Sequence, residues 1–133
     1  MNYYNTLIEV AEDCLATKAE VPKGRGDTKT KPLLEYEMIA RHPYKYTEED
    51  IAFETYAIMH DISKADWSKE RQKFLSQAQA CLRVSALAKR YGWGIHNDAD
   101  GKTAVVAVES AEYKKLANDP NTKIVKAFRS KRA

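Results

Sequence analysis

The sequence predicts a single α+β domain, with a small, mostly antiparallel β-sheet and helices packed on one side. Its 133 residues suit one modest core, and 44% hydrophobic with 31% charged residues is typical of a globular protein. Segments with alternating polarity, typical of strands, are interspersed with segments that have helical spacing and capping residues. The turn signal "DADG" predicts a β-hairpin at about 91–109. We therefore expect residues 1–133 to form one domain.

The N-terminal third predicts a strand, a loop and a helix in that order. Residues 5–11, "NTLIEVA", alternate polarity enough for a strand. Residues 18–32 are polar and contain two glycines and two prolines, which indicates a mobile loop. Residues 33–43 have helical composition, with Pro32 in a position suited to the first turn and Pro43 past the end.

The next helix is expected to begin after Thr47. A threonine N-cap followed by three acidic residues, 48–50, suits a helix N-terminus, where unpaired N–H groups and the helix dipole favour negative charge. Helical spacing predicts that one broad apolar face of this helix is buried. That face comprises Ile51, Ala52, Tyr56, Ile58, Met59 and Ile62. A third helix is expected at residues 67–79.

The C-terminal half predicts the hairpin between two short capped helices. Ser85 and Ser110 are the expected caps, and residues 123–128 could form a last strand before a basic tail at 129–133. In the turn, Asp98 can accept backbone hydrogen bonds while Gly101 adopts a positive φ. This turn pairs Trp93 with Ala107, whereas a two-residue turn would shift the register by one.

The first hairpin strand has an aromatic side and a glycine side. Because side chains alternate along a strand, Gly92, Gly94 and His96 share the face opposite Trp93. Glycine within a strand often marks close approach by another backbone or by a ligand. We therefore expect a shallow trough that ends at His96, filled either by the protein's own helix or ring or by a ligand.

The net charge of +3 hides two basic blocks. Residues 64–90 hold 7 basic and 2 acidic side chains (7 − 2 = +5), and residues 123–133 hold 5 basic and none acidic (+5). These blocks would attract anions if the fold brings them together. The first hypothesis is thus a binding domain for an anionic small molecule or an acidic partner. Its expected ligand-binding residues are Arg83, Lys89, Arg90, Gly92, Gly94 and His96.

Two other classes of function remain open. A cysteine/histidine-dependent enzyme would use Cys81 as nucleophile and His96 as base, with Glu109 as a possible orienting group. Alternatively, segments 83–90 and 123–132 could bind nucleic acid weakly, since basic residues lead directly into aromatic ones. The basic segment at 123–132 could equally contact a protein partner in a structural or regulatory role.

Several classes of site and location are not indicated. The histidines and cysteines have no metal-ligand spacing, and no cofactor motif occurs, so we expect neither metal nor cofactor. Cys14 and Cys81 are too few for a disulfide scaffold. No apolar run is long enough for a membrane span, and the acidic N-terminal segment lacks a basic region, which predicts a cytoplasmic protein.

Four phrases carry a resemblance across nearly the whole chain: "NTLIEVAEDC", "YEMIARHPYKYTEEDIAFE", "CLRVSALAKRYGWGIHNDADGKTAVVAVESAEYKKL" and "KAFRSKR". They resemble a small bacterial family of uncharacterised proteins, classed as a domain of unknown function, with the pattern CLRxSxLxKRYGWGIHxDxxGK. Ala86 and Ala88 depart from it, because at least one proline is expected there. The resemblance implies a single domain and brings no established activity.

Overall fold

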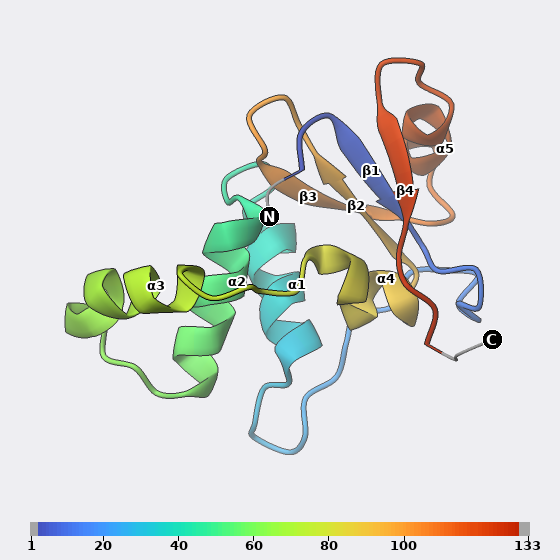
Figure 1. Cartoon of the computed structure of the whole chain (residues 1–133). Coiled ribbons are helices and arrows are strands. Elements are labelled where there is room, and N and C mark those ends of the chain that lie inside the picture. Colours follow the sequence, from blue (N-terminus) through green and yellow to red (C-terminus); the bar gives the residue numbers. More distant parts are fainter. Residues whose placement is uncertain (1–2, 131–133) are drawn as a thin grey trace.

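The fold is α+β, as predicted, and is built on one four-stranded sheet (Figure 1). A computed structural model describes residues 3–130. The strands are β1 (Thr6–Glu9), β2 (Trp93–Asn97), β3 (Thr103–Ala107) and β4 (Lys123–Lys126). They lie in the order β3-β2-β1-β4, in which β1–β2 and β2–β3 are antiparallel and β1–β4 is parallel.

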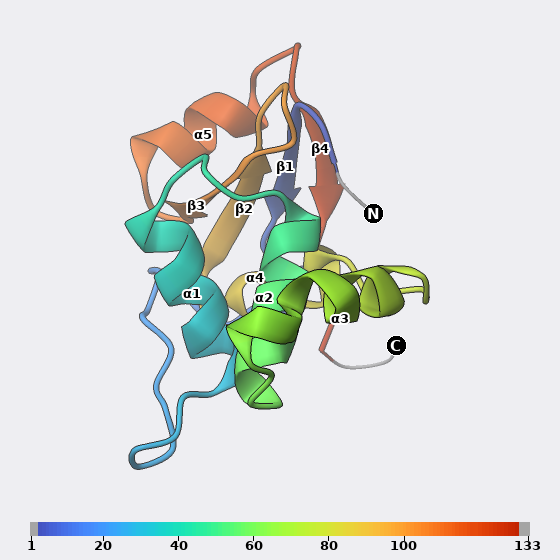
Figure 2. The same ribbon diagram turned by 90° about the vertical axis from the view of Figure 1, so that its left-hand side faces the viewer.

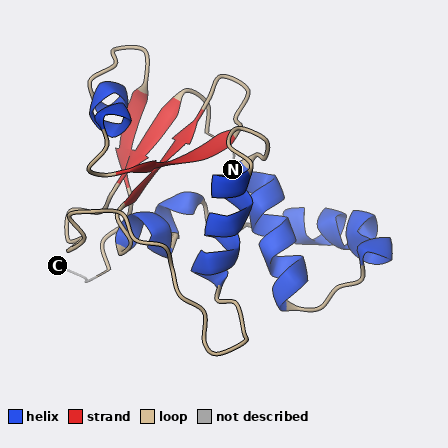
Figure 3. Cartoon of the chain, turned by 180° about the vertical axis from the view of Figure 1, so that it is seen from behind, coloured by secondary structure: helices blue, strands red, loops and turns tan. Residues whose placement is uncertain are grey.

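Five α-helices and two 3₁₀ turns surround this sheet within residues 3–130. They are α1 (Lys31–Arg41), α2 (Glu48–Met59), η1 (Lys64–Asp66), α3 (Trp67–Leu75), η2 (Leu82–Val84), α4 (Ala86–Lys89) and α5 (Ala111–Ala117). Helices α1, α2 and α4 lie against one face, and α5 is an addition on the other (Figures 2 and 3). In the described part of the chain, no helix has the length and apolarity needed to cross a membrane.

The predicted helix caps are confirmed. The Thr47 hydroxyl accepts a hydrogen bond from the Asp50 amide, and the Asp50 carboxylate accepts one from the Thr47 amide, which completes a capping box at α2. Ser85 and Ser110 cap α4 and α5 in the predicted way. These local contacts determine where each helix begins.

The predicted hairpin register is also confirmed. Trp93 pairs with Ala107 and Asn97 with Thr103, so the chain uses the longer of the two turns considered. The Asp98 carboxylate accepts from the Asp100 and Lys102 amides, and Gly101 has a φ of 76°. This register directs Ile95 and Asn97 toward the helices and His96 toward α5.

The main core lies between the sheet and the three helices of its first face. Its members are Ile8, Ala11, Ile39, Ile51, Leu82, Leu87, Ala88, Ile95 and Ala127. The prediction of one buried apolar face on α2 was wrong at its C-terminal end. Ile51 is fully buried in the main core, whereas Ile58 and Met59 are each 50% exposed and do not belong to that core.

The glycine trough is occupied by the protein itself. A Cβ atom at Gly94 would lie 2.6 Å from Cε2 of Tyr113, so the α5 ring packs directly on this glycine. The Tyr113 hydroxyl also accepts a hydrogen bond from the Val10 amide. Gly92 has a φ of 78° and is covered by residues 16–19. Position 94 therefore requires glycine, because any larger side chain would collide with the Tyr113 ring.

The 18–32 segment is attached at its start. The Ala19 amide donates to the Glu109 carboxylate, and the Trp93 indole N–H donates to the Glu20 carbonyl at 2.8 Å. Further along, Arg25 and Thr28 form a two-residue bridge that closes a tight turn. The mobility of this segment stays a prediction.

Replacing Gly94 with alanine tests the close approach of Tyr113. The added methyl group must displace the ring, so we expect a loss of about 1–3 kcal/mol of unfolding free energy, measured by urea denaturation. Combining Gly94→Ala with Tyr113→Leu removes the clash. The two losses should therefore sum to more than the loss in the double variant. Strict additivity would contradict the contact.

Candidate functional site

A cavity of about 280 Å³ lies where α1, α2 and α3 meet the segment that leads into η2. Two glutamates and a cysteine reach it from three separate parts of the chain. The full lining is Lys31, Glu35, Glu48, Ala52, Thr55, Tyr56, Met59, His60, Phe74, Gln79, Ala80, Cys81, Leu82 and Val84.

Glu48 is the most tightly held side chain of this cavity. It occupies the first position of α2 and is only 1% exposed. Its Oε1 accepts from the Leu82 amide at 2.9 Å, and its Oε2 accepts from Asn97 Nδ2 at 2.7 Å. The Thr103 hydroxyl in turn donates to Asn97 Oδ1 at 2.6 Å. One carboxyl group thus joins α2, η2 and the sheet.

Glu35 enters the cavity from the middle of α1. The residue is 4% exposed, and its Oε1 accepts a hydrogen bond from the Ser85 hydroxyl at 2.8 Å. Within residues 3–130, Oε2 of Glu35 has no hydrogen-bond partner, although a carboxylate oxygen can accept two. This oxygen is therefore available to a group that enters the cavity.

Burial dominates the electrostatics of both glutamates. It raises the pKa of Glu35 above the ordinary value of 4.5, against the opposing effects of the Ser85 hydrogen bond and the Lys31 charge. Burial also raises the pKa of Glu48, and the nearby Glu35 adds to this effect. Among residues 3–130, neither carboxyl group forms an ion pair. The cavity thus presents two acids that form no ion pair with a described residue, and the Lys31 charge acts on Glu35 only at a longer distance.

Cys81 lies next to the glutamates, directly before η2. Its thiol is half-buried, and the Tyr3 hydroxyl donates a hydrogen bond to Sγ at 3.4 Å. This hydrogen bond is the largest cause of the raised pKa of Tyr3, followed by burial. A thiol, a phenol and two carboxyl groups are therefore assembled around one cavity.

An aromatic wall forms the outer part of the cavity. The Tyr56 ring lies 4.7 Å from the Phe74 ring and 4.4 Å from the His60 ring, measured between centroids. Met59 continues this wall along α2. Tyr56 and Met59 are apolar residues that α2 leaves partly exposed. The cavity therefore combines an acidic interior with an aromatic entrance.

The predicted basic residues do not line this cavity. Arg83 turns away, since its Nε donates to the Lys126 carbonyl at 2.7 Å and its guanidinium stacks over the Phe128 ring. Lys89 and Arg90 line a separate hollow of about 270 Å³. The structure does bring the two basic blocks together, which is the condition for a shared anion-attracting surface, but it does not place them around the glycines.

His96 is placed away from Cys81. The Tyr44 hydroxyl and Nδ1 of His96 form a hydrogen bond of 2.9 Å on the face that α5 covers. Burial lowers the pKa of His96. Cys81 and Glu48 lie on the opposite face, with Asn97, so the geometry does not pair the predicted nucleophile with the predicted base. Glu109 instead binds the Ala19 amide.

The two glutamates were missed as site residues because single-sequence patterns hide them. Glu48 was read as one of three acids at a helix N-terminus, a position where acids are usually solvated. Glu35 lies four residues before the buried Ile39, hence on the same helix face. An acid within an apolar helix stripe was the available signal for Glu35.

Asn97→Ala tests the polar link between Glu48 and the sheet. It leaves Oε2 of Glu48 and the Thr103 hydroxyl without these partners in a buried setting, so we expect a loss of about 2–4 kcal/mol of unfolding free energy. The control is Asn118→Ala, which removes an exposed hydrogen bond to Lys114 and should change stability by less than about 0.5 kcal/mol. Equal effects in urea denaturation would contradict the link.

Glu35→Gln tests the burial of an unpaired carboxyl group. The pKa of Glu35 is higher in the folded state than in the unfolded state. Its contribution to stability is therefore complete at a pH below the unfolded-state pKa, and it is lost as the pH rises through the folded-state pKa. Glutamine can still accept from Ser85 but does not titrate. As the pH rises from about 4 to about 8, the melting temperature of the variant should therefore fall less than that of the wild-type protein.

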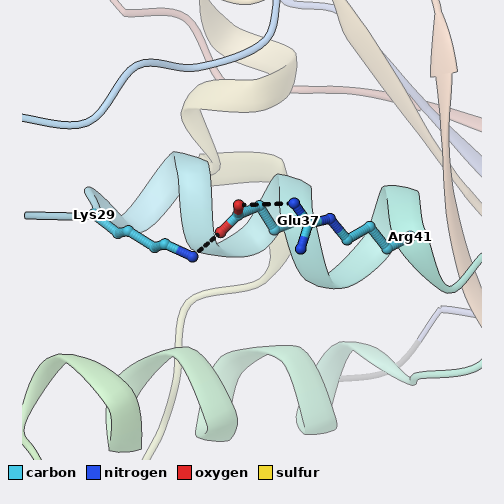
Figure 4. A network of polar contacts seen from close by, with 3 residues as sticks. All are labelled: Lys29, Glu37 and Arg41. Carbon is cyan, nitrogen blue, oxygen red and sulfur yellow. Dashed lines mark hydrogen bonds and ion pairs between the residues drawn. The ribbon is translucent and has the colours of Figure 1, made fainter. Parts of the chain in front are cut away.

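Glu37 on the same helix is the matched control (Figure 4). Its hydrogen bond and ion pair with Lys29 at 2.7 Å, aided by Arg41 at 3.4 Å, lower its pKa. The contribution of Glu37 to stability is therefore present at a pH above its unfolded-state pKa and is lost as the pH falls through its folded-state pKa. This pH dependence is opposite to that of Glu35. If Glu35→Gln and Glu37→Gln change the melting profile in the same direction, the assignment of Glu35 fails.

Comparison with known proteins supplies a family and no activity. No curated protein matches this chain, and no solved structure matches it either. A family model does match, over residues 1–133, and its description is a family of unknown function, DUF6157. The match spans the entire sequence, including both glutamates and Cys81. The chain therefore belongs to the DUF6157 family of unknown function.

Proposed function

We propose that this protein is a binding domain for a small molecule that carries a cationic nitrogen, such as an amine. The observation that carries the proposal is the pair of buried glutamates, Glu35 and Glu48, which line one cavity and form no ion pair with a described residue. This site replaces the glycine trough as the binding site that the geometry supports best.

The charge of the cavity favours a cation over the anion expected from composition. A buried carboxylate is costly unless a positive or hydrogen-bonding group compensates it. An ammonium group offers three donors, and Oε2 of Glu35 is free to accept one of them. Lys31 and His60 are the basic groups at the cavity, and Lys31 acts on Glu35 only at a distance.

The aromatic wall suits the remainder of such a ligand. Tyr56 and Phe74 present stacked rings, and a cation near an aromatic face gains further stabilisation. A cavity of about 280 Å³ accommodates a small organic molecule, with its apolar part against Met59 and the rings. A hydrated metal ion would leave this apolar wall without a function.

A matched set of probes tests the proposal. Phenethylamine, phenethyl alcohol and phenylpropionate share a ring and a short chain but differ in charge, and amide chemical-shift changes report their binding. We expect the amine to shift signals of residues around the cavity. Glu35→Gln should weaken its affinity at least about tenfold, which corresponds to about 1.4 kcal/mol, and Lys31→Ala should strengthen it by removing a like charge.

The pH dependence gives a second readout of the same experiment. Carboxylates attract the amine and carboxylic acids do not, so affinity should fall as pH falls through the raised pKa values of the glutamates. Glu37→Gln is the control and should leave affinity within about twofold. Stronger binding of phenylpropionate than of the amine would overturn the proposal.

A second candidate is a thiol-dependent enzyme, favoured by the placement of Cys81 in this cavity. Since His96 lies on the other face of the sheet, a cavity carboxylate would have to accept the thiol proton. The hydrogen bond from Tyr3 to Sγ would stabilise the resulting thiolate. The carboxylates that attract a cation would then also serve as proton acceptors.

Alkylation separates this candidate from simple binding. In a Cys14→Ser background, chloroacetamide should modify Cys81 faster at neutral pH than it modifies a free thiol, whose pKa is about 8.5. Tyr3→Phe should slow the reaction several-fold by removing the hydrogen bond to sulfur. A Cys81 that reacts no faster than a free thiol would remove the enzyme candidate and leave the binding proposal intact.

A further inference from the structure

A second surface gathers three segments that are far apart in the sequence. The Phe128 amide donates to the Arg83 carbonyl at 2.9 Å, and the Ala11 amide donates to the Ala88 carbonyl at 2.9 Å. The Ser130 amide donates to the Asp13 carboxylate at 3.0 Å. Residues 11–15, 83–90 and 126–130 therefore lie side by side, below the sheet in Figure 1.

The centre of this surface is a hollow of about 270 Å³ lined by Asp13, Leu15, Lys89, Arg90 and Ser130. Leu15 is 95% exposed and provides the apolar side of this hollow beside the two basic residues. Lys89 and Arg90 form no ion pair with any residue of 3–130. The hollow thus combines one apolar wall with two cations that lack an acidic partner in the described chain.

The acids near the hollow are already engaged. The Asp13 carboxylate accepts from the Ser130 amide, and Glu12 forms an ion pair with Arg129 at 2.9 Å. Lys126 and Arg83 extend the positive charge along the same edge. Such a surface is complementary to negative charge, which agrees with the basic blocks noted in the sequence.

From this we propose that the surface around Leu15, Lys89 and Arg90 binds an acidic segment of a partner protein. The segment inserts an apolar side chain beside Leu15 and places its carboxylates against Lys89 and Arg90. The proposal is independent of the amine site, because it uses a different cavity and the opposite charge.

The shape and chemistry favour an acidic peptide over the other polyanions. A hollow with an aliphatic wall receives a side chain, whereas a flat bilayer surface would contact only its rim. Proteins bind single-stranded nucleic acids by stacking bases on exposed aromatic rings, whereas the described lining of this hollow contains no aromatic residue and Arg83 lies 4.3 Å over one face of the neighbouring Phe128 ring. Carboxylates on a flexible chain can meet both cations at once.

Fluorescence anisotropy with a labelled peptide of four Glu-Glu-Leu repeats tests the proposal. We expect binding at about 50 mM salt that weakens at least about tenfold by about 300 mM salt, because the contacts are exposed charges. Two further peptides distinguish the contribution of the carboxylates to binding from that of the apolar side chains. A Gln-Gln-Leu repeat lacks the charge and a Glu-Glu-Ser repeat lacks the apolar side chain, so each should bind at least about fivefold more weakly.

Protein variants locate the surface. Lys89→Gln with Arg90→Gln should weaken binding at least about tenfold, and Leu15→Ser should weaken it several-fold without changing its salt dependence. The control is Lys69→Gln with Lys114→Gln, which removes the same charge from exposed positions on α3 and α5 and should change affinity less than twofold. Circular dichroism confirms that each variant is folded.

Several outcomes would overturn the proposal. These are no peptide binding at low salt, an equal effect of the control variant, tighter binding of anionic vesicles or of single-stranded DNA than of the peptide, and self-association of the protein through this surface in sedimentation. None of these outcomes bears on the amine site. Failure of the amine site would likewise leave this surface untouched.

Discussion

The carboxyl group of Glu48 is the contact on which the arrangement of this protein depends. It stands at the N-terminus of α2 and accepts hydrogen bonds from the Leu82 amide and from Asn97 on β2. These hydrogen bonds connect α2 to the sheet and to the segment before α4. The same group lines a cavity beside Glu35 and Cys81, so the element that organises the fold also forms part of the candidate site.

Such an arrangement costs stability, and the cost points to a function. Two carboxyl groups, 1% and 4% exposed, would be ionised less readily than in water and gain little from each other. Apolar residues of similar size could fill the space with less penalty. Buried acids that form no ion pair with a described residue are therefore most simply understood as groups kept for a ligand or for proton transfer.

The acidic and the basic side chains of the two candidate binding sites lie on different surfaces of the protein. Acids gather in a cavity with an aromatic entrance, whereas Lys89 and Arg90, which form no ion pair with a described residue, lie around a hollow beside Leu15. One surface suits a small cation and the other an acidic segment.

Local features of this fold could be predicted from the sequence, and long-range ones could not. The caps at Thr47, Ser85 and Ser110 and the turn at Asp98 depend on residues within four positions of one another. The partners of Glu48 are 34 and 49 residues away, so no local pattern identifies them. The same holds for Tyr113, which fills the trough over Gly94.

The charge pattern revealed two basic blocks but did not determine whether or where they would meet. Arg83 joins Lys126 and Phe128, while the glycines lie beneath α5 and residues 16–19. A functional pairing of Cys81 with His96 assumed that both side chains share a face of the sheet. The hairpin register, which the sequence does predict, directs His96 to the face opposite Asn97, whereas only the structure shows that Cys81 lies on the Asn97 side.

The most direct test of this account is a carbon-13 titration of the glutamate carboxyl groups, with Glu35 and Glu48 assigned through their own backbone amides. Glu35 and Glu48 should both titrate above the ordinary value of 4.5, whereas Glu37 should titrate below it. Titration of Glu35 and Glu48 at or below 4.5 would contradict it, because the cavity would then not hold buried, uncompensated acids.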